Sequence, residues 1–90
     1  MTVAKLRAPI FDPKFMNDLM SLGRSRKQLA RRTLELVAAA CQDHARGPGN
    51  PEPLSHNWSG YWSRRINQEH RLIYRLTNGE IEFCQAKGHY

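Results

Sequence analysis

Cationic side chains that could bind phosphate groups gather in one part of this sequence, between residues 61 and 75. They are four arginines and a histidine: Arg64, Arg65, His70, Arg71 and Arg75. A guanidinium group donates two parallel hydrogen bonds to phosphate oxygens, so several guanidiniums on a rigid element can form a phosphodiester site. The alternative is a charged face that is merely solvated.

The charge of the whole 90-residue chain also favours a polyanionic partner. Fourteen Lys and Arg oppose eight Asp and Glu, a formal net charge of +6. This balance indicates nucleic acid first and anionic lipid second. Calcium and magnesium sites need clustered carboxylates, and the longest apolar run, residues 36–41, is too short to span a bilayer. We therefore expect no metal, no cofactor and no membrane partner.

The other reactive side chains lack the spacing of familiar sites. The histidines at 44, 56, 70 and 89 are not closely spaced, and the sequence has no phosphate loop, dinucleotide fingerprint or nucleophile elbow. Cys41 and Cys84 have no CxxC spacing. We interpret them as reduced core thiols of a cytoplasmic protein.

The elements that position the arginines follow from local patterns. Mixed β-branched, apolar and cationic residues predict a first strand over Val3–Phe11. Because Pro9 has no N–H to donate, this strand should lie at a sheet edge or stop near Pro9. Asp12 and Pro13 are typical of a helix start. Gly23 is typical of a helix C-terminus.

A second helix is predicted over Ser25–Ala45, with an inner apolar stripe. Its first turns carry cations, among them Arg31 and Arg32, although the helix dipole opposes positive charge at that end. Such local conflicts sometimes mark binding surfaces. Arg31 and Arg32 are therefore candidate RNA-binding residues, with a solvated face as the alternative.

After the Gly47–Pro51 break the pattern becomes alternating, which predicts three antiparallel strands over Tyr61–Ile66, Arg71–Leu76 and Glu80–Ala86. Asn78-Gly79 is a strong hairpin signal between the last two.

Alternation also divides the arginines between two faces of the sheet. Arg65 lies with Tyr61 and Ser63, whereas Arg64 lies with Trp62 and Ile66. The whole chain, residues 1–90, is thus predicted to form one α+β domain. An N-terminal strand and two helices precede a three-stranded antiparallel meander, and the helices pack on one face of a small sheet.

Long motifs cover the second half of the chain: PEPL at 51–54, NWSGYWSRRI at 57–66, EHRLIY at 69–74 and a terminal HY. These motifs resemble the Txe/YoeB family, toxins of type II toxin–antitoxin modules in the RelE/ParE superfamily. Residues 1–50 match only in element order and length. The family fold, a small curved sheet packed on two helices, agrees with the order predicted above.

The resemblance implies a ribosome-dependent mRNA endonuclease that inhibits translation. The 2′-hydroxyl of A-site mRNA attacks the adjacent phosphorus, leaving a 2′,3′-cyclic phosphate and a 5′-hydroxyl. This chemistry needs a base, an acid and cations for the developing negative charge. It needs no metal.

By motif position, the resemblance implies that Glu52 is the general base and His89 the general acid, since imidazole titrates near neutrality. Arg65 and Arg71 would clamp the phosphate and stabilise the transition state, and Tyr90 would hold the substrate. Simpler alternatives exist: a loop carboxylate paired with an arginine, surface ion pairs, and an ordinary frayed chain end.

Within the same motifs, Glu69 and His70 are expected to orient other groups. Three residues after the PEPL glutamate the family commonly has a lysine, and this chain has Ser55. Loss of one stabilising donor can lower a rate by about 10²–10³-fold. Arg64 or Lys87, both assigned here to RNA binding, could replace the missing cation.

The resemblance also implies partners. They are a cognate antitoxin with a flexible acidic tail, the ribosome with its mRNA, and a second copy of the chain in a homodimer. Two rival functions stay open. A degenerate toxin would bind antitoxin and rRNA without cleaving, as Ser55 suggests. A ParE-like gyrase poison would share the fold but leave the matched residues without a role.

Overall fold

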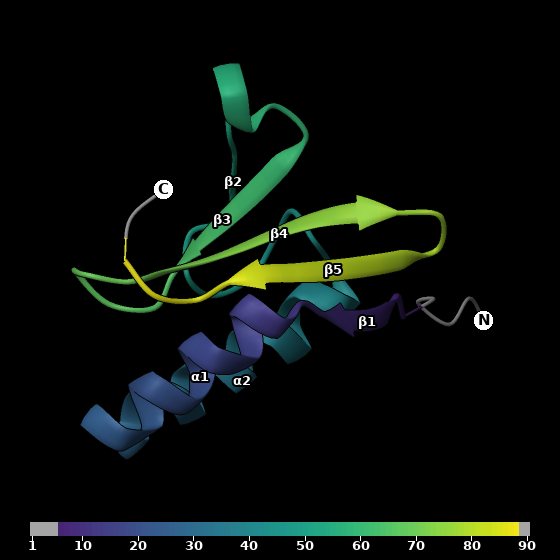
Figure 1. Cartoon of the computed structure of the whole chain (residues 1–90). Helices are drawn as coiled ribbons and strands as arrows, with labels where there is room; N and C mark the ends of the chain where they lie inside the picture. Colours follow the sequence, from purple (N-terminus) through teal and green to yellow (C-terminus); the bar gives the residue numbers. More distant parts are fainter. Residues whose placement is uncertain (1–5, 89–90) are drawn as a thin grey trace.

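The computed structural model describes residues 6–88, which form a sheet with two helices on one face (Figure 1). In chain order the elements are β1 (Ala8–Phe11), α1 (Pro13–Ser25), α2 (Lys27–Gln42), β2 (Glu52–Pro53), the 3₁₀ turn η1 (His56–Trp58), β3 (Tyr61–Arg65), β4 (Arg71–Thr77) and β5 (Glu80–Gln85).

The sheet has five strands in the order β1-β5-β4-β3-β2. The antiparallel meander β3-β4-β5 forms its centre. β1 pairs with β5 in parallel, and the two-residue β2 pairs with β3 antiparallel. Both edge strands therefore come from segments that precede the meander in the sequence.

The core lies between the helices and the sheet. It contains Phe15 and Leu22 of α1, Leu36 and Ala40 of α2, and strand residues that point to the same side: Leu72, Tyr74, Ile81 and Phe83, all 0–1% exposed in this set. Among the described residues, α1 and α2 both lie on this side of the sheet, and neither covers the opposite face (Figure 1). We call it the open face.

The predicted meander and its hairpin turn are confirmed, and so is the edge position of the first strand. The described part of that strand is shorter than predicted, beginning at Ala8, and residues 3–5 lie outside the described residues. β2 was not predicted. It has only two residues, the second of them a proline, and so short a segment gives no alternation to detect.

The start of α1 is confirmed, with Asp12 as N-cap and Pro13 at the first helical position. The predicted end at Gly23 is wrong, since α1 continues to Ser25. Gly23 instead faces α2, where an added Cβ would meet the Cβ of Ala30 at 3.4 Å. The second helix is shorter than predicted at both ends, running from Lys27 to Gln42.

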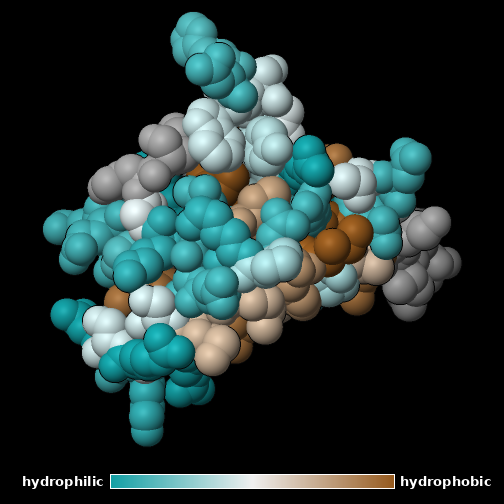
Figure 2. All heavy atoms as spheres, in the orientation of Figure 1, coloured by the Kyte–Doolittle hydropathy of each residue, from teal (hydrophilic) through white to brown (hydrophobic). Residues whose placement is uncertain are grey.

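Hydrophobic side chains reach the surface along β1 and α1, between hydrophilic areas (Figure 2). They include Ile10, Phe11, Met16 and Met20, which are 37–54% exposed. No helix in the part of the chain that the structure describes is long and apolar enough to cross a membrane.

Candidate functional site

A carboxylate and a guanidinium meet on the open face where β2, β3 and β4 lie side by side. Glu52 is paired with Ser63 in the sheet register, and Arg65 is paired with Arg71. Nη1 of Arg71 lies 3.5 Å from Oε1 of Glu52 and donates to Oγ of Ser63 at 3.3 Å. Glu52, Ser63 and Arg71 thus form one contact group.

Two members of this group can be reached by a ligand, whereas Ser63 is fully buried. The side chain of Glu52 is 45% exposed and that of Arg71 is 18% exposed. Arg65, at the end of β3 and opposite Arg71, is exposed. A polyanion on the open face would therefore meet a carboxylate and two guanidiniums together.

The position of Glu52 depends on backbone contacts on both sides of it. Upstream, the amide N–H of Arg65 donates to the carbonyl of Gly49 at 2.6 Å. Downstream, the amide N–H of Leu54 donates to the carbonyl of Tyr61 at 2.8 Å. Pro53 has no N–H for the ladder, which suits an edge strand.

The C-terminal segment returns to the same end of the sheet. Asp18, buried on α1, accepts the amide N–H of Ala86 at 3.0 Å. Gly88, the last described residue, donates to Nδ1 of His70 at 2.9 Å, and its carbonyl accepts the amide N–H of Arg71 at 3.2 Å. The chain thus reaches Arg71 immediately before His89 and Tyr90, which lie outside the described residues.

Other predicted residues lie around this group or away from it. Glu69 is 80% exposed and near His70, with 4.0 Å between the carboxylate and Nε2. Ser55 is exposed at the start of η1. Lys87 is exposed and donates from Nζ to Oγ of Ser21 at 2.9 Å. Arg31 and Arg32 belong to α2, on the other face of the sheet.

The expectation that Arg64 binds RNA is wrong, because its side chain faces the helices and is 0% exposed. Its guanidinium donates hydrogen bonds to groups within the protein. They are a tyrosine hydroxyl and the carbonyls of the segment between α2 and β2. Arg64 therefore cannot replace the cation missing at Ser55.

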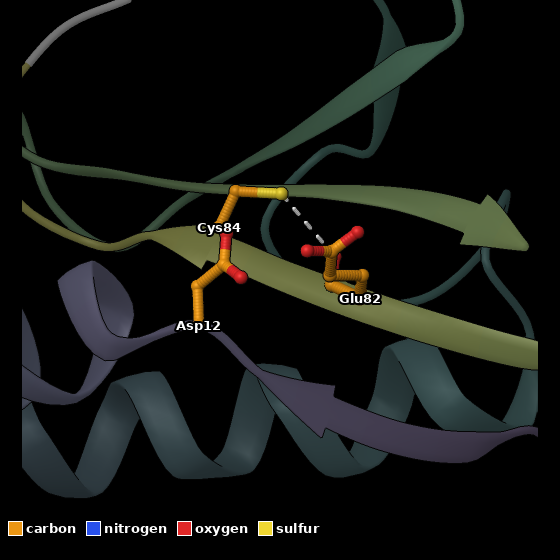
Figure 3. A group of neighbouring side chains, drawn as sticks. All are labelled: Asp12, Glu82 and Cys84. Atoms are coloured by element: carbon orange, nitrogen blue, oxygen red, sulfur yellow. Dashed lines mark hydrogen bonds between the residues drawn. The ribbon is translucent and has the colours of Figure 1, made fainter.

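A second polar cluster on the open face joins the start of α1 to β5 (Figure 3). Ligand atoms of Asp12, Glu82 and Cys84 lie within 4.8 Å of one another. Nε of Arg75 donates to Oε1 of Glu82 at 2.6 Å. No local pattern in the sequence indicates this cluster, because residues 12 and 82 are brought together only by the parallel pairing of β1 and β5.

The carboxyls and the thiol of this cluster have shifted pKa values. The hydrogen bond from Arg75 lowers the pKa of Glu82, and a hydrogen bond with Glu82 raises the pKa of Asp12. Burial raises the pKa of the Cys84 thiol to about 11. The amide N–H of Asp12 also donates to the carbonyl of Phe83 at 3.0 Å, so we interpret the cluster as a tie between the start of α1 and β5.

Both cysteines are reduced, as predicted, and both are half-buried. Cys41 packs against the core, and burial raises the pKa of its thiol. Cys84 differs from the prediction, because it lies beside two carboxylates on the open face.

The fold is that of a class of proteins with solved structures, the small α+β toxins of bacterial toxin–antitoxin systems. Residues 11–90 match the sequence profile of the YoeB-like toxin of the bacterial type II toxin-antitoxin system. Toxin YoeB of Mycobacterium bovis is 40% identical over 85 residues, which are 94% of this chain and all of that protein.

Two solved structures have the same fold. The YoeB dimer from Staphylococcus aureus has a TM-score of 0.82 at 35% identity, covering 97% of this chain and 100% of that one. In the YoeB–YefM complex from the same species, the matched chain has a TM-score of 0.81 at 33% identity, covering 93% of this chain and 98% of that one. The chain belongs to the YoeB toxin family.

Proposed function

We propose that this protein is a metal-independent endoribonuclease that cleaves mRNA in the ribosomal A site and so inhibits translation. The observation that carries the proposal is the contact between Glu52 and Arg71, 3.5 Å apart on the open face. Membership of a toxin family supports it.

The reaction begins with proton transfer from the 2′-hydroxyl of the substrate to the carboxylate of Glu52. The 2′-oxygen attacks the adjacent phosphorus, and the bond from phosphorus to the 5′-oxygen breaks. His89 gives its proton to that oxygen. The products are a 2′,3′-cyclic phosphate and a 5′-hydroxyl.

The two guanidiniums supply the electrostatic part of the catalysis. Arg65 and Arg71 are directly opposite each other on the neighbouring strands β3 and β4. A rigid sheet fixes these donors before the reaction, which is the condition for strong stabilisation of developing charge. In the free protein Arg71 pairs with Glu52. When the substrate binds, Arg71 pairs with the scissile phosphate, and Glu52 is left free to accept the proton.

The remaining predicted residues assist this core. Tyr90 holds the substrate backbone beside the acid. His70 and Glu69 orient the C-terminal segment, since His70 accepts the amide N–H of Gly88. Arg31, Arg32 and Lys87 contribute positive charge for rRNA.

The partners follow from the family. One solved relative is a YoeB–YefM complex and another is a YoeB dimer. This chain likewise binds a cognate antitoxin, whose acidic tail covers the open face, and forms a homodimer. It acts on the ribosome in the cytoplasm.

One observation favours a second candidate, a degenerate toxin that binds without cleaving. Ser55 carries no charge, Arg64 is buried, and Lys87 donates to Ser21. Among the described residues, Arg65 and Arg71 are then the cations nearest to the proposed base in the sheet register.

The test is cleavage of a short mRNA in the A site of a programmed ribosome. Wild type should cleave, and Glu52→Gln should cleave at least about 10²-fold more slowly, a typical effect of removing a general base. Glu80→Gln is the matched control, because Glu80 is an exposed glutamate at the start of β5. Ribosome binding without cleavage by wild type would support the degenerate toxin instead.

A further inference from the structure

The side chain of Arg64 is a fully buried cation that is satisfied by backbone carbonyls. Nη1 donates to the carbonyl of Pro48 at 3.0 Å. Nη2 donates to the carbonyls of Asp43 and Arg46, the latter at 2.8 Å. None of the salt bridges found within residues 6–88 includes this guanidinium.

Tyr74 completes the arrangement from the neighbouring strand. Its hydroxyl accepts from Nε of Arg64 at 3.0 Å and donates to the carbonyl of His44 at 2.6 Å. Arg64 and Tyr74 together bind four carbonyl oxygens, which we call the carbonyl cage: those of Asp43, His44, Arg46 and Pro48.

The cage sets the shape of the segment that runs from α2 to β2, behind the meander in Figure 1. Gly47 and Gly49 have φ of +109° and +87°, which glycine adopts without strain. A Cβ on Gly49 would lie 3.0 Å from Leu36 and 3.1 Å from the Cβ of Arg64. The segment is therefore pressed closely against Arg64.

This segment leads directly to the proposed base. Gly49 accepts the amide N–H of Arg65, and only Asn50 and Pro51 separate Gly49 from Glu52. Glu52 itself lies in a two-residue edge strand that is paired on one side only. So short a strand is a weak anchor, and the position of Glu52 therefore depends also on the flanking segments, of which this one is the upstream side.

We propose that Arg64 and Tyr74 are positioning residues for catalysis, which through the carbonyl cage hold Glu52 in reach of Arg71 and of the substrate 2′-hydroxyl. This inference rests on the proposed function. The consecutive residues Arg64 and Arg65 then have different roles, because Arg64 holds the base and Arg65 contacts the phosphate.

The principal test variant is Tyr74→Phe, which removes one hydroxyl and keeps the ring in the core. Arg64→Lys keeps the charge and loses the planar fork. Arg46→Gln is the control, because the cage uses the carbonyl of Arg46 and its exposed side chain has no part in it. Each variant is measured for single-turnover mRNA cleavage and for ribosome affinity.

A displacement of about 1 Å at a reacting group can cost about 10²-fold in rate. Tyr74→Phe and Arg64→Lys should therefore lower the single-turnover rate by roughly 10- to 10²-fold at unchanged ribosome affinity. In a Glu52→Ala background the same substitutions should cause no further loss, because they act through Glu52. Wild-type rates for both folded variants, or equal losses in both backgrounds, would overturn the proposal.

Hydrogen exchange separates this inference from the proposed function. Tyr74→Phe should speed the exchange of amides in residues 43–52 and leave those of β4 and β5 protected. If wild type and Glu52→Ala cleave equally, the proposed function fails, and faster exchange would still establish the cage. Unchanged amide exchange in residues 43–52 of Tyr74→Phe would overturn the carbonyl cage itself. This measurement uses Tyr74→Phe, so it decides the question even if Arg64→Lys does not fold.

Discussion

Arg64 and Arg65 are adjacent in β3 but differ in exposure. Arg64 is fully buried beneath the segment that forms the carbonyl cage, whereas Arg65 is exposed beside Arg71. The period of a strand places them on opposite faces of the sheet. Arg64 therefore contacts the loop that leads to Glu52, and Arg65 lies on the face that would bind RNA.

Substitution of Arg65 should impair cleavage without destabilising the protein. Its exposed side chain contributes little to folding, whereas removal of a donor from developing charge costs about 10²–10³-fold in rate. Arg65→Gln should therefore show this loss in single-turnover cleavage and an unchanged urea midpoint. Full activity of Arg65→Gln would remove it from the site.

Asp18 should stabilise the attachment of the C-terminal segment to α1. It is 8% exposed and accepts the amide N–H of Ala86. Asp18→Ala leaves that buried N–H unpaired, at a cost of about 1–3 kcal/mol in the free energy of unfolding. Urea denaturation measures the change. Lys14→Met is the control, because the Lys14 partner is 61% exposed and exposed pairs contribute about 0–1 kcal/mol. Equal effects of the two variants would contradict the assignment.

Cys84 should be an unreactive thiol at neutral pH. Its pKa is about 11, raised mainly by burial from an ordinary value of 9.0, and only the thiolate attacks alkylating reagents. In a Cys41→Ser protein, alkylation should be slow at pH 7 and accelerate steadily up to about pH 11. Rapid alkylation of the folded protein at pH 7 would contradict the buried position of the thiol.

The Arg75–Glu82 pair should stabilise the fold only above acidic pH. The hydrogen bond from Arg75 lowers the pKa of Glu82 below its ordinary value of 4.5. Its contribution is therefore fully present above pH 4.5 and is lost as the pH falls through the lower folded value. The difference in unfolding free energy between wild type and Glu82→Gln should shrink over that window. A difference that grows on acidification would reverse the assigned sign.

Asp12 provides the opposite pH dependence in the same cluster. Its pKa is raised by the hydrogen bond with Glu82, so its contribution is present below its ordinary value of 3.8 and is lost as the pH rises through the higher folded value. Comparing Asp12→Asn with wild type across this range should show an advantage of wild type that declines with rising pH. A constant difference would mean that the two carboxyls do not share a proton.

The sequence contained enough information to predict the meander and its faces. Alternation in residues 61–76 and the Asn78-Gly79 turn are local signals that divide each strand between two faces, and the register of β3 with β4 then puts Arg65 and Arg71 on one side of the sheet. The same alternation put Arg64 with Trp62 and Ile66. Those apolar neighbours indicated that Arg64 faces the core. The several arginines of residues 61–75 favoured its assignment to RNA binding instead.

The rest depends on contacts between distant segments. β2 exists because Glu52 and Pro53 pair with β3, which no local pattern reveals. The cluster of Asp12, Glu82 and Cys84 requires β1 to lie parallel to β5 across most of the chain length. The carbonyl cage requires a non-repetitive loop to fold over a strand residue.

The most direct test of the account is cleavage of an A-site mRNA with one 2′-deoxynucleotide immediately 5′ of the scissile phosphate. We expect no cleavage at that bond, because the attacking 2′-oxygen is absent. The all-ribose control should be cleaved and should carry a 2′,3′-cyclic phosphate end. Cleavage of the deoxy-substituted bond would show that another nucleophile attacks, and would contradict the role of Glu52 as base for the 2′-hydroxyl.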